Sequence, residues 1–174
     1  RQVRDLTPFD GVHAELVADS PRRPSEILVA LNLQDRGRMD VHRIDFRSGA
    51  VTLDTKNPGT VTTWAATDDL VVKAGVASRA DGGQELLVRD SAKGAWRTLT
   101  RGGPDDTVDL LDLTADGKSV LYISSAGAPT ARVVQRALSG GPEKVLASNP
   151  EVDPSDVSVH PTRHIVEGVV FEPG

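Results

Sequence analysis

Two histidines, His160 and His164, stand four residues apart in the string HPTRH. On a helix this spacing would put both imidazoles on one face, where they could bind a metal ion. Pro161 and the phase of a repeat described below instead predict a turn between two strands, so we expect no metal site there. His13 and His42 lie far apart and belong to no motif, which favours surface or strand positions for both.

A run of carboxylates is the second group that could do chemistry, because calcium takes several oxygen ligands. The spacing does not follow a D-x-D-x-D-G loop, and charged loops between short strands are ordinary. We therefore expect no cation site among Asp105, Asp106, Asp109, Asp112 and Asp116. Asp116 precedes a glycine and is better explained as a turn former.

Nucleophiles and aromatic ligand platforms are not indicated either. Ser20, Ser78 and Ser124 have no neighbouring pattern that would activate a hydroxyl group. The chain contains no G-x-S-x-G motif and no cysteine, which also excludes thiolate metal sites and disulfides. We expect Trp64 and Trp96 to pack in a core or between sheets. The sequence thus predicts no catalytic, cofactor-binding or metal-binding residue, and no cofactor.

Composition limits the remaining classes. The 174 residues, 38% hydrophobic and 26% charged, suffice for one compact domain. The net charge is −5 and no stripe of Lys and Arg forms, so we expect no nucleic-acid partner. No apolar stretch approaches the roughly 18 residues that cross a bilayer, so we expect no membrane partner. The lack of cysteine is compatible with a reducing compartment, and we expect a cytoplasmic protein.

The sequence predicts short strands as its main secondary structure. Eleven prolines and sixteen glycines are spread along the chain and leave little room for a long amphipathic helix, which predicts an all-β fold. The string LTADGKSVLYI, residues 113–123, places an Asp-Gly turn directly before a run of β-forming residues. It therefore predicts a hairpin.

This hairpin recurs with a constant spacing. The positions equivalent to Thr114 are Ser20, Thr67 and His160, at steps of 47, 47 and 46 residues. Two further ladders have nearly the same period: Gly49, Gly94, Gly140, and Leu6, Leu53, Leu99, Leu146. Periods of 40 to 50 residues in an all-β sequence are typical of the four-stranded blades of a β-propeller.

The period divides the chain into one propeller segment, residues 1–174. Residues 1–7 are expected to supply the outer strand of a preceding blade. Complete blades are expected over 8–55, 56–101 and 102–148, and the first two strands of a further blade over 149–174. The prediction is thus a partial propeller of four-stranded antiparallel blades, with about three complete blades and parts of two others. A closed ring usually needs at least four blades, so we expect an incomplete ring whose open edges allow self-association.

The strings also resemble a known family. LTADGKSVLYI is similar to the blade signature of TolB-type and WD-repeat-like propellers. DLTPFDG, the turn at Ser20-Pro21, DVHRIDFRSG and RDSAKGAWRTL resemble the propeller of prolyl oligopeptidase-family serine peptidases, of the acylaminoacyl-peptidase or dipeptidyl-aminopeptidase kind found in bacteria. The resemblance covers residues 3–172.

The resemblance implies a non-catalytic role. In such enzymes the N-terminal propeller sits over an α/β-hydrolase domain and limits access of peptide substrates to the catalytic serine. That domain would be a partner in the same parent chain, outside these residues, so the triad is placed on none of them. The alternative is a stand-alone propeller module of the TolB or WD-repeat kind that binds another protein.

Overall fold

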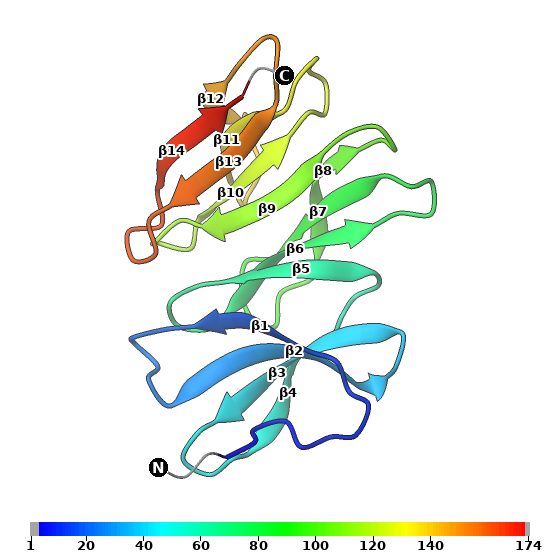
Figure 1. Ribbon diagram of the computed structural model, residues 1–174, viewed down its shortest axis with the longest axis vertical. Coiled ribbons are helices and arrows are strands. Elements are labelled where there is room, and N and C mark those ends of the chain that lie inside the picture. The colour runs from blue at the N-terminus through cyan, green and yellow to red at the C-terminus, as the bar shows by residue number, and fades with distance from the viewer. Residues whose placement is uncertain (1–3, 173–174) are drawn as a thin grey trace.

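The computed structural model describes residues 4–172, and its strands, β1 to β14, are the regular elements of that range. Within these residues, no helix is long and apolar enough to cross a membrane. The strands form three sheets of four and one of two, which follow one another along the molecule (Figure 1).

Each sheet is a meander in which strands adjacent in sequence pair antiparallel. The first sheet contains β1 (Ala14–Asp19), β2 (Glu26–Asp35), β3 (Arg38–Asp45) and β4 (Val51–Thr55). The second contains β5 (Val61–Ala66), β6 (Val72–Ser78), β7 (Gln84–Val88) and β8 (Arg97–Gly102). The third contains β9 (Val108–Leu113), β10 (Ser119–Ser124), β11 (Arg132–Ala137) and β12 (Lys144–Ser148). The last is the hairpin of β13 (Pro154–Val159) and β14 (Val166–Phe171).

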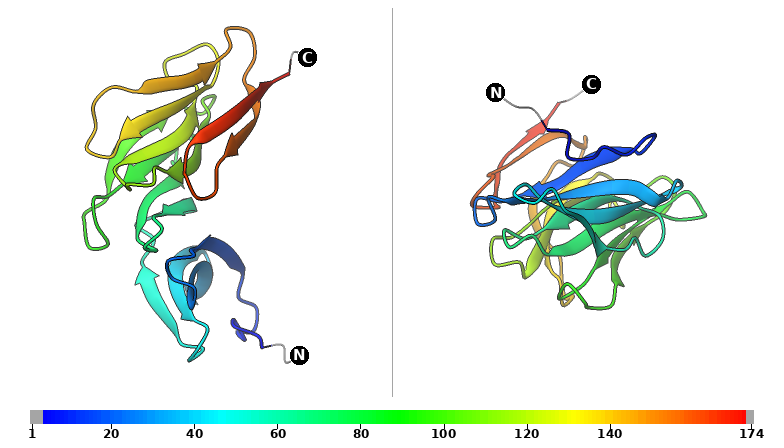
Figure 2. Two further views of the ribbon diagram at one scale, coloured as in Figure 1. Left: turned by 90° about the vertical axis from the view of Figure 1, so that its left-hand side faces the viewer. Right: turned by 90° about the horizontal axis from the view of Figure 1, so that it is seen from below.

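The predicted fold class is confirmed: the molecule is all-β and forms a partial propeller of four-stranded antiparallel blades. The first strands of the three complete blades are neighbours, with β1 beside β5 and β5 beside β9. The left view in Figure 2 shows the blades in succession, with the two ends of the described chain at opposite ends of the row. The first strands are therefore the inner strands of the propeller.

The described part of one expected strand does not form a strand. Residues 1–3 of the predicted outer strand 1–7 lie outside the described residues, and residues 4–7 form no strand. Asp5 accepts a hydrogen bond from the Thr7 amide and Phe9 donates to the Thr7 carbonyl, which bends the chain. Leu6 and Phe9 then pack against the free face of the first blade. Burial of these side chains takes the place of edge pairing.

Hydrophobic clusters join the blades face to face. One cluster lies between the first and second blades and includes Leu28, Val41 and Trp64. Another lies between the second and third blades and includes Leu86 and Tyr122. β6 contributes Val72 and Ala77 to the first cluster and Ala74 and Val76 to the second. The middle strands are therefore buried on both faces, which explains their apolar sequences without strict alternation.

The turn at Gly117 shows how closely blades approach at their inner ends. Gly117 has a φ of +63°, and a Cβ atom there would lie 2.9 Å from Cγ2 of Thr67 in the second blade. Because the left-handed region costs other residues about 1–2 kcal/mol, we expect Gly117→Ala to lower the free energy of unfolding by about 2 kcal/mol. Urea denaturation followed by tryptophan fluorescence measures this difference.

Gly127→Ala is the matched control for this substitution. Gly127 has a φ of +70°, but a Cβ atom at this position would meet nothing within 4 Å. Gly127→Ala should therefore lower the free energy of unfolding only by the cost of the left-handed backbone, about 1 kcal/mol. Equal losses in the two variants would show that the approach to Thr67 contributes nothing to stability.

Candidate functional site at the inner turns

The four residues of the first repeat ladder occupy the same turn, between the first and second strands of each blade. Each accepts a hydrogen bond from a backbone N–H of its own turn. The donors and distances are Arg22 to Ser20 Oγ, 3.2 Å; Val71 to Thr67 Oγ1, 3.3 Å; Ser119 to Thr114 Oγ1, 3.1 Å; and Thr162 to His160 Nδ1, 3.2 Å. The period in the sequence thus reflects a shared geometry: one acceptor side chain that closes each inner turn.

A second shared feature is a left-handed residue near the end of the turn. It is Leu70 in the second blade with φ 57°, Gly117 in the third with φ 63°, and His164 in the last with φ 52°. Among residues 4–172, Leu70 and His164 are the non-glycine residues with positive φ. Leu70 is fully buried in the cluster between the first two blades, and this burial offsets the backbone cost.

The left-handed residue is also the point where the preceding blade attaches. Arg43 Nη2 in β3 donates to the Leu70 carbonyl at 2.8 Å. Lys73 Nζ in β6 donates to the Gly117 carbonyl at 3.0 Å. In the last hairpin the imidazole of His164 makes the attachment instead.

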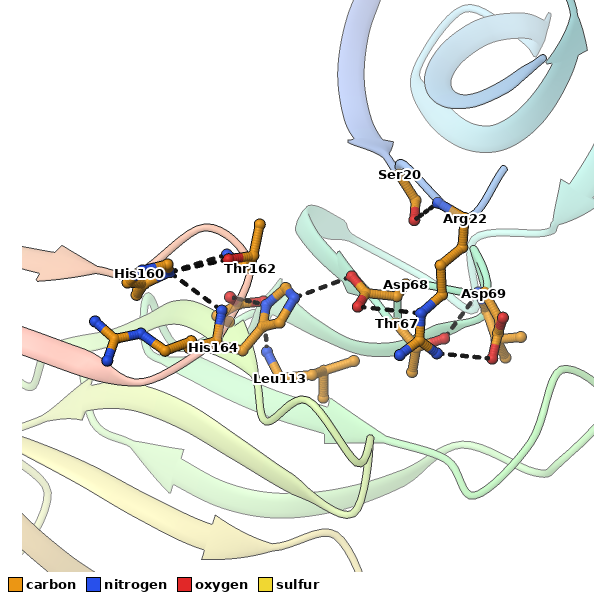
Figure 3. A network of polar contacts seen from close by, with 12 residues as sticks. Ser20, Arg22, Thr67, Asp68, Asp69, Leu113, His160, Thr162 and His164 are labelled. Atoms are coloured by element: carbon orange, nitrogen blue, oxygen red, sulfur yellow. Dashed lines mark hydrogen bonds and ion pairs between the residues drawn. The ribbon is translucent and has the colours of Figure 1, made fainter. Parts of the chain in front are cut away.

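The His164 imidazole lies between two carboxylates from different blades. Its Nδ1 is 2.7 Å from Asp112 Oδ2 in β9, and its Nε2 is 3.0 Å from Asp68 Oδ1 in the β5–β6 turn (Figure 3). The side chain is 13% exposed and both carboxylates are 22% exposed. One residue therefore joins the second and third blades to the hairpin.

The surroundings change the pKa of His164 in opposite directions. Burial lowers the pKa, but the hydrogen bonds and charges of Asp112 and Asp68 outweigh it, and the net effect raises the pKa above 6.5. Asp112 is itself fixed by the Leu113 amide, which donates to its Oδ1 at 2.7 Å. On the far side of Asp68 lies Arg22, with Nε 3.8 Å from Oδ2.

A cavity of about 340 Å³ adjoins this cluster. Its walls come from the inner strands β1, β5 and β9 and from the turn of the hairpin. Carboxylates dominate its polar lining, in the form of Asp19, Asp68 and Asp112, and Trp64 and Pro161 are among its apolar lining residues. A volume in this range accommodates a small ligand or a short piece of peptide.

The histidine string HPTRH forms a turn, and its two imidazoles have different tasks. His160 Nδ1 accepts the amides of Thr162 and Arg163, whereas His164 binds the two aspartates. No group of three His, Asp or Glu side chains that could hold a metal ion occurs in the described part of the chain. His13 is exposed and pairs with Glu15.

The run of acidic residues does not converge. Asp106 accepts the Gly103 amide at 2.7 Å, Asp112 binds His164, and Asp116 accepts the Lys118 amide at 3.0 Å and the Thr114 hydroxyl at 2.7 Å. Asp105 and Asp109 lie exposed in a loop and on β9. The carboxylates therefore serve separate turns and one contact between blades.

The other residues considered as candidates, which are serines, tryptophans and His42, all have structural roles. Ser20 and Ser124 accept amides of their own turns. Ser78 ends β6, where its carbonyl accepts the hydroxyl of Thr60. The rings of Trp64 and Trp96 lie 6.0 Å apart and pack against the first blade. His42 is buried in β3, with Nδ1 3.0 Å from the Asp40 carbonyl.

The Asp68–His164–Asp112 cluster is the part of the site that sequence reasoning missed. Asp68 and His164 are 96 residues apart, and His164 was expected only to form a turn. The repeat gave no signal for it, because the step of 46 residues that relates Thr114 to His160 relates Gly117 to Arg163, and His164 lies one residue further along.

Sequence comparison identifies a longer relative. No family model matches the chain. Dipeptidyl aminopeptidase BIII of Pseudoxanthomonas mexicana is 31% identical over 170 residues, which cover 97% of this chain and 24% of the relative. The chain thus spans about a quarter of the length of this curated relative.

Solved structures share the fold at low sequence identity. Dipeptidyl peptidase 4 of Porphyromonas gingivalis has a TM-score of 0.61 at 18% identity, over 90% of this chain and 22% of that chain. TolB of Acinetobacter baumannii has a TM-score of 0.59 at 22% identity, over 92% and 38%. A prolyl endopeptidase has a TM-score of 0.56 at 15% identity, over 84% and 23%.

Proposed function

We propose that this chain is a β-propeller segment of the prolyl oligopeptidase type, the family that its sequence resembles. In this role it limits access of peptides to a hydrolase domain of the same parent protein. The hydrolase domain would supply the catalytic serine, and the propeller would supply shape. Peptide substrates and the hydrolase partner are parts of this proposal.

The cavity at the inner turns is the observation that carries the proposed gating role. It lies against three inner strands and the last hairpin, and its volume of about 340 Å³ suits a short segment of peptide. Beside this cavity, His164 joins the hairpin to Asp112 of the third blade and Asp68 of the second blade. These contacts restrain the inner turns from moving apart. An inner passage of this kind would admit short peptides and reject folded chains.

The full-length parent protein provides the test. We expect it to carry a downstream domain with a G-x-S-x-G motif and to release p-nitroaniline from dipeptidyl p-nitroanilides with a free amino terminus. Against peptides of increasing length, kcat/KM should fall by at least about tenfold between short peptides and chains of domain size. The similarity to a dipeptidyl aminopeptidase favours dipeptidyl substrates over N-acylated amino acids, so an N-acetyl-aminoacyl p-nitroanilide tests the acylaminoacyl-peptidase alternative.

Replacement of the motif serine by alanine is the control, because it should abolish turnover of every substrate. A parent protein with no hydrolase domain would overturn the peptidase assignment. Equal kcat/KM for short and long substrates would overturn gating while leaving the assignment in place.

A protein-binding module of the TolB kind remains the second candidate, and the fold likeness to TolB is what favours it. A parent chain that closes its ring and then stops would support this candidate. The cytoplasmic location also remains a proposal, supported by the lack of cysteine.

Self-association through the open ends of the row of blades is a further proposal about partners. Large exposed hydrophobic side chains lie in the first blade, at Leu16, Phe46 and Leu53, and at the other end, at Val145, Ile165 and Val170. Their distribution over the first blade, β12 of the third blade and the hairpin supports contacts between copies at the two ends of the row.

A further inference from the structure

Few polar contacts attach the β13–β14 hairpin to the blades: directly before β13, Asp153 Oδ1 accepts the Ala131 amide of the third blade at 2.7 Å, and within the hairpin His164 makes two. Neither of its strands contains a buried residue. A cavity of about 500 Å³ separates it from the third blade, between Leu121, Gln135 and Leu146 on one side and Ile165 and Val166 on the other. Among the described residues, the polar contacts from 154–172 to the first three blades are the two made by His164.

These two contacts require the His164 imidazole to carry a second proton. A carboxylate only accepts hydrogen bonds, and a neutral imidazole has a single N–H. Both nitrogens of His164 face carboxylate oxygens, at 2.7 Å and 3.0 Å. The imidazolium form donates to both, whereas a neutral ring would leave one lone pair facing an anion.

Other charged groups lie near His164 without bonding to its ring. In the first blade, Arg22 approaches Asp68 at 3.8 Å and Asp69 at 3.9 Å, but its side chain is 61% exposed. Asp116 of the third blade lines the larger cavity together with His164. On the hairpin, Arg163 pairs with Glu167, and His160 is turned toward its own backbone amides. The groups that bond to the ring itself are thus the two carboxylates.

We propose that protonated His164 is a latch that fastens the β13–β14 hairpin to the second and third blades, and that loss of its proton releases the hairpin and opens the cavity beside the third blade. The latch depends on the Asp68–His164–Asp112 geometry and holds whether or not the parent protein is a peptidase. Its opening would change the cavity of about 340 Å³ that His164 also lines.

The direction with pH follows from linkage. The pKa of His164 is raised in the docked state, because the effects of Asp112 and Asp68 exceed that of burial. The docked state therefore binds the proton more tightly than the released state. Its extra stability is fully present below about pH 6.5, the ordinary histidine pKa, and is lost as the pH rises through the raised value.

Hydrogen exchange of the 174-residue chain tests the latch. Protection factors, corrected for the intrinsic rate at each pH, should fall for amides of β13 and β14 between about pH 6 and about pH 9. The fall should be about tenfold for each unit by which the pKa of His164 exceeds 6.5. Amides of β6 and β10 should keep their protection. Constant protection of the hairpin over this range would overturn the proposal.

Labelled histidine locates the proton. The imidazole ¹⁵N and ¹³C shifts of His164 should report the doubly protonated ring at about pH 6 and follow the same midpoint as the exchange data. The other histidines, at positions 13, 42 and 160, serve as internal comparisons. A neutral His164 ring at about pH 6 would place the proton elsewhere and overturn the proposal.

Two variants separate the latch from a merely structural role. His164→Asn tolerates the left-handed backbone but carries no titratable group, so hairpin protection should become independent of pH. His164→Gly removes backbone strain and leaves an acidic space, so added imidazole should restore protection at about pH 6 and not at about pH 9. Lack of rescue in a folded His164→Gly protein, or retained pH dependence in His164→Asn, would contradict the latch.

Discussion

Replacing Tyr122 by alanine is expected to lower the free energy of unfolding by about 3–5 kcal/mol. Tyr122 is fully buried in the cluster between the second and third blades, where Val88 and Val134 are members of the same core. Its removal would leave a cavity that the surrounding strands fill only in part, since each is fixed by its own ladder of hydrogen bonds. Urea denaturation monitored by the fluorescence of Trp64 and Trp96, which lie in another cluster, measures the loss.

Tyr122→Phe is the matched control because it keeps the ring. The Tyr122 hydroxyl donates to Glu143 Oε1 at 2.7 Å, and Glu143 also pairs with Arg132. Loss of this one hydrogen bond should cost about 1 kcal/mol. A loss in Tyr122→Ala no larger than in Tyr122→Phe would show that the inter-blade core is not tightly packed.

The single tyrosine gives a second readout. Burial, and then the hydrogen bond and charge of Glu143, raise the pKa of Tyr122 above 10. The folded state therefore retains the phenol proton, and this contribution to stability is present below about pH 10 and is lost as the pH rises further. Phenolate absorbance should appear only as the protein unfolds.

The repeat made the fold predictable because stacked blades impose one environment on every copy. In the third unit the period predicts strands at 108–113, 119–124, 131–138 and 143–147, and these ranges agree with β9 to β12 within one residue. The N-terminal segment was predicted less well. Its alternating residues suit an edge strand, but pairing depends on a partner, and here Leu6 and Phe9 found an apolar face instead.

The candidate site was less accessible to sequence reasoning than the fold. The ladder through Ser20, Thr67, Thr114 and His160 marked the inner turns without revealing which of their side chains come into contact. The contact of Asp112 with His164 spans 52 residues, and no local pattern specifies it. The acidic run, in which no cation site was expected, is spread over turns and β9, and Asp106, Asp112 and Asp116 each bind a different partner.

Replacing Arg89 by alanine is expected to lower the free energy of unfolding by about 3 kcal/mol, through the joint between the first and second blades. The Arg89 side chain is nearly fully buried. Nε donates to the Val72 carbonyl at 2.8 Å, and Nη2 donates to Thr55 Oγ1 of the first blade at 2.7 Å. Its guanidinium also lies 4.6 Å from the ring centre of Trp96. Truncation would leave two buried acceptors without donors, at about 1–3 kcal/mol each, and would remove the cation–π contact.

Arg89→Lys and Arg38→Ala distinguish this joint from a simple effect of charge. Lysine keeps the positive charge but lacks the planar fork that reaches both acceptors, so it should recover less than half of the loss, about 1 kcal/mol. Arg38 pairs with Asp35 at 4.0 Å on the exposed surface, and its truncation should cost less than about 1 kcal/mol. Chemical denaturation in the same buffer compares the three variants. If Arg89→Ala and Arg38→Ala were equally mild, the buried arginine would contribute nothing measurable to the joint between the first and second blades.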